Sequence, residues 1–214
     1  ASETSFAVLG QEESCTGDPA KRAGNEFLYQ MQAAQNIATL NGYEIKRIIT
    51  GCPHCFNVLK NEYPELGGNY EVLHHTQFIR ELIETGKLRM ADGAPFRGKR
   101  ITFHDPCYLG RGNGEYLAPR EVIQKLDAEL LEMRRCKQNA MCCGAGGAQM
   151  FKEAEKGDSE VNHERTNEAL ENKPEVIATG CPFCNTMITD GVKNANQESE
   201  VEVKDIAELI AEAA

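Results

Sequence analysis

Tryptophan is absent from the 214-residue sequence, and no run of apolar residues reaches the roughly 18 positions that would span a bilayer. The first residues, Ala1 to Thr4, show no basic region followed by an apolar one, so there is no sign of a secretory leader. Basic residues are scarce: 23 Lys and Arg against 33 Asp and Glu give a formal charge of -10. This balance argues against a nucleic-acid partner. We therefore expect a cytoplasmic protein that reaches a membrane only through partner domains.

Cysteine, in contrast, is abundant. An odd number of cysteines without an export signal argues against a disulfide scaffold. In a reducing compartment, clustered cysteines indicate metal or redox chemistry. The nine cysteines stand at positions 15, 52, 55, 107, 136, 142, 143, 181 and 184.

The sequence contains an internal repeat centred on two CxxC motifs. The segment from Ile49 to Asn57 recurs from Ala178 to Thr186, and each copy follows a β-branched run. Upstream, Cys15 lies 37 residues before Cys52, and Cys143 lies 38 residues before Cys181. A period of about 128 residues is too long for a solenoid and indicates two homologous halves. We place them at 1–92 and 99–214, on either side of a Gly/Pro-rich stretch.

Short apolar segments alternate with longer amphipathic ones along both halves. This alternation predicts an α/β protein in which each half is a small parallel sheet flanked by helices. The cysteine loops should lie at the carboxyl ends of the strands, where such sheets place their ligands. The expected strands are 5–9, 44–50, 70–73, 100–103, 129–133, 175–179 and 201–203, and the expected helices are 19–40, 53–63, 77–85, 119–126, 158–172, 182–194 and 205–213.

Each CxxC motif stands where a strand ends and a helix begins. In the first copy Cys52 is expected as the N-cap and Pro53 as the first helical residue, a position that suits proline. The sulfurs of Cys52 and Cys55 would then lie near free N–H groups at the positive end of the helix, which favours thiolate. The copy at Cys181 and Cys184 follows the same pattern. Buried thiols and a thioredoxin-like dithiol are the alternatives.

Three more cysteines complete a set of five in the second half. Cys142 and Cys143 are adjacent and precede Gly144, whose freedom at positive φ lets backbone N–H groups approach a bound group. Cys107 ends a predicted strand 35 residues before Cys142. Four thiolates hold an ordinary [4Fe–4S] cube, so five predict a less symmetric group or an exchangeable ligand.

This arrangement resembles the cysteine-rich CCG domain. The resemblance rests on Cys107, Cys142-Cys143-Gly144 and Cys181-Pro182-Phe183-Cys184, with His104-Asp105-Pro106 before the first cysteine. The family includes the B-type and D-type components of heterodisulfide reductase and iron–sulfur components of glycolate oxidase, lactate utilisation and anaerobic glycerol-3-phosphate dehydrogenase. The resemblance implies a [4Fe–4S]-type cluster, cubane or non-cubane, on Cys107, Cys142, Cys143, Cys181 and Cys184. It also implies other redox subunits or domains of a longer protein as partners, including a membrane quinone system.

The first half departs from that pattern. It reads Cys15-Thr16-Gly17, and we assign Ser14 to the place of the first adjacent cysteine. The counterpart of Cys107 would fall before residue 1, so we expect an excerpt or a degenerate version of a longer protein. Cys15, Cys52 and Cys55 would form a zinc site with one of the histidines 54, 74 and 75, or hold a second iron–sulfur cluster with an outside ligand.

Several other residues near these motifs also carry expectations. His104 is expected to hydrogen-bond a cluster sulfur or the backbone, or else to give a proton to a departing thiolate. His74 and His75 are expected to cap a helix or lie on the surface. The stretch 160–165 around His163 should form a solvated helix face, and Cys136 should be a loop thiol.

Three functions follow from these observations. The leading hypothesis is an iron–sulfur redox module of a heterodisulfide-reductase-like oxidoreductase, passing electrons to a disulfide or a quinone-linked acceptor. The second is a structural zinc domain that mediates assembly. The third is a metal-free dithiol oxidoreductase.

Overall fold

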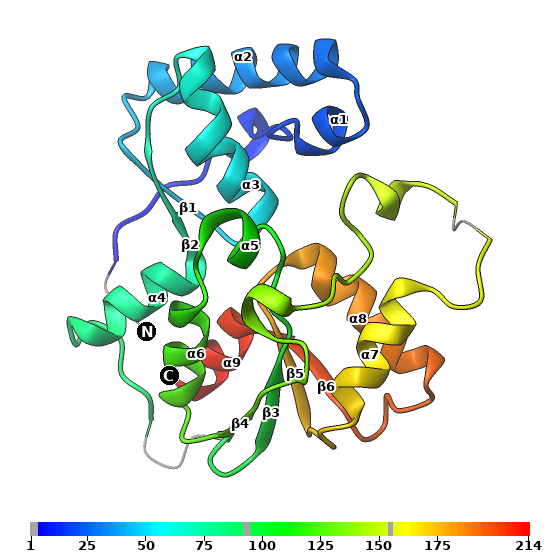
Figure 1. The fold of residues 1–214 in the computed structure, drawn as a ribbon. Helices are drawn as coiled ribbons and strands as arrows, with labels where there is room; N and C mark the ends of the chain where they lie inside the picture. The colour runs from blue at the N-terminus through cyan, green and yellow to red at the C-terminus, as the bar shows by residue number, and fades with distance from the viewer. Residues whose placement is uncertain (1–3, 92–94, 154–155) are drawn as a thin grey trace.

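Two small parallel sheets form the framework of the computed structural model, which describes residues 4–91, 95–153 and 156–214 (Figure 1). The first sheet pairs β1 (Arg47–Thr50) with β2 (Glu71–His74), with Ile48 opposite Val72. The second has the order β4-β3-β5-β6, and every neighbouring pair is parallel. Its strands are β3 (Arg100–Phe103), β4 (Glu129–Leu131), β5 (Val176–Thr179) and β6 (Glu202–Asp205). The predicted α/β class with two parallel sheets is confirmed.

The first sheet is covered by the helices that precede and follow β1. These are α1 (Asp18–Arg22), α2 (Glu26–Gly42) and α3 (Pro53–Asn57), which continues as a π-helix over Val58–Glu62 and a 3-10 helix over Tyr63–Leu66. The single helix expected over 19–40 is wrong, because the chain breaks at Gly24 with a φ of 83° and Asn25 then caps α2. The buried side chains of this half come mainly from α2 and the π-helix.

The second sheet is flanked on both faces. Its helices are α5 (Gly110–Asn113), α6 (Leu117–Gln124), α7 (Val161–Leu170), α8 (Pro182–Asn194) and α9 (Ile206–Ala213). All four residues of β5 are buried, as expected of a central strand in a covered parallel sheet. Short 3-10 helices lie at Gly10–Glu12, Lys137–Asn139 and Gln149–Phe151.

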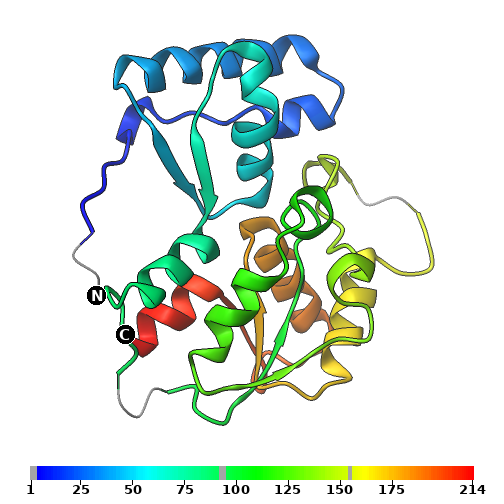
Figure 2. The ribbon, with the colours of Figure 1, turned by 60° about the vertical axis from the view of Figure 1, so that its left-hand side comes forward.

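Helix α4 (His75–Glu84) joins the two halves. It begins at the end of β2 and packs beside α9 and α6 of the second half (Figure 2). Leu82 belongs to the same buried cluster as Ile101 and Leu209. The boundary predicted at 91–98 includes residues outside the described ranges, so the division into 1–92 and 99–214 stays a prediction.

His74 links the first sheet to the second CxxC loop. It caps α4 in a reciprocal capping box with Gln77, as expected of this histidine, but both His74 and His75 are buried rather than exposed. His74 Nδ1 lies 2.8 Å from Thr76 Oγ1, and Nε2 donates to the carbonyl of Gly180 at 3.0 Å. One buried imidazole ring therefore connects the end of β2 to the residue before Cys181.

The strand expected over residues 5–9 does not form. These residues adopt no strand conformation, and Phe6 and Val8 are 83% and 77% exposed. An extended segment becomes a strand only when a neighbouring strand satisfies its backbone groups.

The prediction that residues 160–165 form a solvated helix face is wrong for Arg165. Arg165 is fully buried, and its Nη1 donates to Glu168 and to the carbonyl of Arg135. Helix α7 packs closely against α8 at Gly191. A Cβ atom at this position would lie 2.0 Å from Thr166 Oγ1, so only glycine fits. His163 is half-buried on the same helix.

The Arg165 network predicts a large loss of stability when the guanidinium is removed. Arg165→Met leaves the buried Glu168 carboxylate with one partner fewer, so the free energy of unfolding should fall by about 3 kcal/mol. Arg97→Met is the control, because the Arg97–Asp127 pair is exposed and should contribute about 0.5 kcal/mol or less. Urea denaturation measures both, and equal losses would contradict the assignment.

His74 predicts a dependence of stability on pH. Burial, with His75 beside it, lowers the pKa of His74 from 6.5 to about 3. Below pH 6.5 the unfolded chain binds a proton that the folded chain does not, so stability is lost as the pH falls toward 3. Between pH 7 and pH 5 wild type should lose about 2 kcal/mol more than His74→Gln, which keeps an amide donor but does not titrate. Parallel pH profiles of the two proteins would refute this.

Candidate metal centre

The cysteines of both halves gather at the carboxyl ends of the strands. Cys52 follows β1 as the N-cap of α3, and Cys181 follows β5 as the N-cap of α8, each with proline at the next position. Cys107 follows β3 after a short extended segment, and Cys142 and Cys143 lie in the loop between β4 and α7. The location predicted for the cysteine loops is therefore confirmed.

The five cysteines predicted for the second half are brought together. They lie next to one another in an order that we call the sulfur line, with Cys143, Cys181 and Cys184 in one buried cluster. It runs from Cys107 to Cys142, Cys143, Cys184 and Cys181 in that order. It continues into the first half, because Cys181 contacts Cys52 and Cys52 contacts Cys55.

Cys142 is one of two sulfurs in this line that are poised as thiolates. Hydrogen bonds from Cys107 and Cys143 hold the pKa of Cys142 well below its usual range. The backbone N–H of Gly144 adds a bond at 3.3 Å, and that of Gly146 also contributes. The donors shift the opposite way: the pKa of Cys107 rises, and that of Cys143 rises to about 11.

Cys181 is the second thiolate. Hydrogen bonds from Cys184 and Cys52 lower its pKa well below the usual value, although burial opposes the shift. The pKa of Cys184 rises, and that of Cys52 rises to about 12 through its bond to Cys181. Thiolates are the form in which sulfur binds metals, so Cys142 and Cys181 are in the form that binds a metal-containing group.

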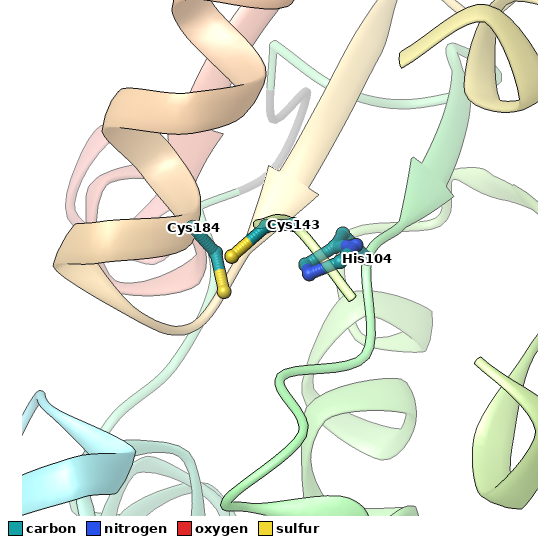
Figure 3. A group of neighbouring side chains, drawn as sticks. All are labelled: His104, Cys143 and Cys184. Atoms are coloured by element: carbon teal, nitrogen blue, oxygen red, sulfur yellow. The ribbon is translucent and has the colours of Figure 1, made fainter. Parts of the chain in front are cut away.

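His104 lies beside the sulfur line with one nitrogen unpaired. One ring nitrogen of His104 and the sulfurs of Cys143 and Cys184 lie within 4.8 Å of one another, and all three residues are buried (Figure 3). Arg165 Nε donates to His104 Nδ1 at 2.9 Å. Because a guanidinium cannot accept a proton, the neutral ring carries its hydrogen on Nε2. That N–H has no hydrogen-bond partner among the described residues.

The environment of His104 keeps the ring neutral. Burial and the neighbouring charge of Arg165 lower its pKa to about 3. A neutral ring with an orphaned Nε2–H suits hydrogen bonding to sulfur better than metal ligation, because Nε2 has no lone pair to give. The residues present therefore fit an anionic sulfur-containing group held by Cys143 and Cys184. The contact of Arg165 with His104 was not predicted from the sequence, in which the only feature of Arg165 is its place in a charged helix.

The first half contains a turn of the same geometry as the CCG turn. Gly17 and Gly144 have φ of 90° and 95°, and each N–H points to the cysteine sulfur two residues earlier. The distances are 3.5 Å from Gly17 N to Cys15 Sγ and 3.3 Å from Gly144 N to Cys142 Sγ. Cys15 therefore corresponds to Cys142.

This match corrects the assignment of Ser14 to a cysteine position. Ser14 lies before the turn, and its hydroxyl donates to Asn36 Oδ1 at 2.6 Å. Thr16 occupies the place of Cys143, since its hydroxyl donates to Cys55 Sγ at 3.4 Å just as Cys143 contacts Cys184. Aligning the two glycines, rather than the cysteine spacings, would have found this from the sequence.

Two of the three histidines considered as zinc ligands, His54 and His74, are hydrogen-bonded elsewhere. His54 Nδ1 lies 2.9 Å from Asp18 Oδ2, and its ring stacks near Tyr108 and Phe183. His74 uses both nitrogens, as described above. His75 Nε2 lies 2.9 Å from Asp205 Oδ1, but neither ring nitrogen of His75 makes a hydrogen bond within the described residues.

The remaining cysteines lie off the sulfur line. Cys15 is exposed, although its turn is held by Asn36 Nδ2, which donates to the Cys15 carbonyl at 2.9 Å. Cys136 is a half-buried loop thiol, as expected.

None of the helices in the described ranges is both long and apolar enough to cross a bilayer. The chain is similar to parts of several larger redox proteins. It is 45% identical to the "EtfAB:quinone oxidoreductase" of Syntrophomonas wolfei over 96% of this chain and 29% of that protein. It is 46% identical to the "Probable iron-sulfur-binding oxidoreductase FadF" of Bacillus subtilis, over 97% of this chain and 29% of that protein.

A third relative is named for a heterodisulfide reductase. The chain is 36% identical to a component of the dihydromethanophenazine:CoB--CoM heterodisulfide reductase of Methanosarcina barkeri, over 97% of this chain and 51% of that protein. The chain thus spans between about a third and half of the length of these relatives. The family model described as "Cysteine-rich domain" matches residues 1–60 and 101–189. The chain belongs to the family of cysteine-rich CCG domains.

Proposed function

We propose that this chain is an iron–sulfur redox module whose second half holds a cluster on Cys107, Cys142, Cys143, Cys181 and Cys184. The observation that carries the proposal is the gathering of these thiols: Cys143, Cys181 and Cys184 share one buried cluster, and the sulfur line continues from it to Cys142 and Cys107. A structural zinc ion takes four ligands in a closed tetrahedron and has no use for a fifth thiolate. A cluster of several irons offers more positions for sulfur donors than a single zinc ion does, and an ordinary cube already uses four thiolates.

The surroundings of the five thiols also favour a cluster. When bound, such a group takes up and releases single electrons. The backbone N–H of Gly144 and the orphaned Nε2–H of His104 are donors that stabilise additional negative charge on sulfur. Arg165 places a buried positive charge behind His104.

The names of the relatives suggest what exchanges electrons with the module. One relative is named for a quinone and another for a heterodisulfide. We propose that the chain passes electrons between another redox domain or subunit of a longer protein and an acceptor of one of these two classes. A quinone acceptor would bring the module to a membrane through its partner.

The cluster itself is tested by metal analysis of anaerobically reconstituted protein. Wild type should contain about four irons and four sulfides in the second half and give an electron paramagnetic resonance signal on reduction. Cys143→Ser should lose or change that signal, whereas Cys136→Ser, off the sulfur line, should leave it unaltered. A colourless wild type that contains zinc alone would support the structural zinc domain instead. Dithiol oxidoreductase activity that survives Cys143→Ser in metal-free protein would support the dithiol enzyme.

His104 should set the midpoint potential of this cluster. Removing an N–H donor destabilises the reduced, more negative state, so His104→Phe should lower the potential by about 60 mV, a tenfold change in the one-electron equilibrium. His104→Gln keeps an amide N–H and should restore most of that shift. A redox titration followed by paramagnetic resonance measures both, and indistinguishable potentials in all three proteins would exclude the hydrogen bond.

A further inference from the structure

Thr16 stands in the first half where the second half has Cys143. The evidence is the shared turn: two glycines at positive φ, two N–H groups directed at Cys15 and Cys142, and two side chains that contact the CxxC motif of their own half. The difference between the halves at this position is therefore a hydroxyl in place of a thiol.

The exchange of these two groups changes the chemistry of the first site. Cys143 connects Cys142 to Cys184 through sulfur contacts. Thr16 instead donates an O–H to Cys55 Sγ. A neutral hydroxyl does not become an anion near neutral pH, so the first half has three thiols, one fewer than the four that hold an ordinary cluster.

The buried charged groups near the two sites also differ, with a carboxylate in the first half and a guanidinium in the second. Asp18 is buried close to Cys55, and its carboxylate helps to raise the pKa of that thiol. The buried charged group near Cys143 is the guanidinium of Arg165, through His104. Both charges are paired within the protein, Asp18 with Arg22 and Arg165 with Glu168, so the main difference between the two sites is the hydroxyl of Thr16 in place of a thiol.

We infer that Thr16 is the specificity-determining residue of the first site, and that its hydroxyl keeps this half from assembling an ordinary four-thiolate cluster. The inference rests on the proposed function. It implies that Thr16→Cys, which completes a set of four with Cys15, Cys52 and Cys55, converts the first half into a cluster site. The turn is already fixed for this change, because Tyr63 Oη donates to the Thr16 carbonyl at 3.1 Å.

The test uses the whole chain with the second site disabled by Cys143→Ser and Cys184→Ser. In this background, protein with Thr16 should take up little iron, and Thr16→Cys should take up about four irons and four sulfides per chain. Thr16→Ser, which keeps a hydroxyl, is the matched control and should behave like Thr16. Far-ultraviolet circular dichroism confirms that each variant is folded.

Two results would overturn the inference. One is a folded Thr16→Cys protein that takes up no more iron than Thr16→Ser. The other is a background protein that already holds a cluster with Thr16 in place. Failure of the proposed function is a separate result, since it appears as the absence of iron from wild type with its second site intact.

A second measurement uses the chain with an unmodified second site. Because Cys52 contacts Cys181, a cluster gained by Thr16→Cys would lie next to the existing one. The paramagnetic resonance spectrum of the reduced variant should then show spin–spin broadening that wild type and Thr16→Ser lack. An unchanged spectrum together with an unchanged iron count would reject the inference.

Discussion

The structure depends on the convergence of thiols at the carboxyl ends of parallel strands. Residues distant in sequence meet there because every strand in each sheet runs in the same direction and ends at the same edge. Cys52 and Cys181 begin helices at that edge, so free N–H groups lie close to sulfur. A line of contacting thiols shares its protons unevenly, and the low pKa values of Cys142 and Cys181 follow from that sharing.

The same constraint joins the two halves. Cys52 reaches Cys181 across the junction, and His74 bonds the carbonyl that precedes Cys181. Helix α4 adds apolar contacts by packing between the first sheet and helices of the second half. The two cysteine regions are therefore adjacent, and a substitution in one CxxC loop alters the surroundings of the other.

Much of the fold and of the cysteine site was predictable from the sequence, because local patterns determine the strands, the helix caps and the positions of the CxxC motifs. Six of the seven expected strands form, each within a few residues of its predicted place. The strand at 5–9 failed because its existence depends on a partner strand, which no local pattern reveals. The burial of Arg165 was not predicted because a charged residue in a helix normally faces solvent, and only its tertiary contacts with His104 and the carbonyl of Arg135 reverse that expectation.

The assignment of Ser14 failed for a different reason. Counting residues between cysteines treats loop length as fixed, although loops change length more easily than turns change conformation. The glycine at positive φ is the more reliable marker, since only a few residue types tolerate that backbone. Gly17 and Gly144 therefore identify the equivalent positions where the spacing of cysteines misleads.

The buried donors around His104 show how this fold relates stability to function. His104 Nε2 and Arg165 Nη2 are buried without a partner among the described residues, and each unpaired donor costs about 1–3 kcal/mol. A sheet optimised for stability alone would place apolar side chains there. Retaining donors beside Cys143 is understandable if a sulfur-containing anion accepts their hydrogen bonds, because the cost is then offset on binding. Binding and folding of the second half are coupled for this reason: the unpaired Nε2–H of His104 lowers the stability of the free protein, and the same N–H would stabilise the cluster in its reduced state.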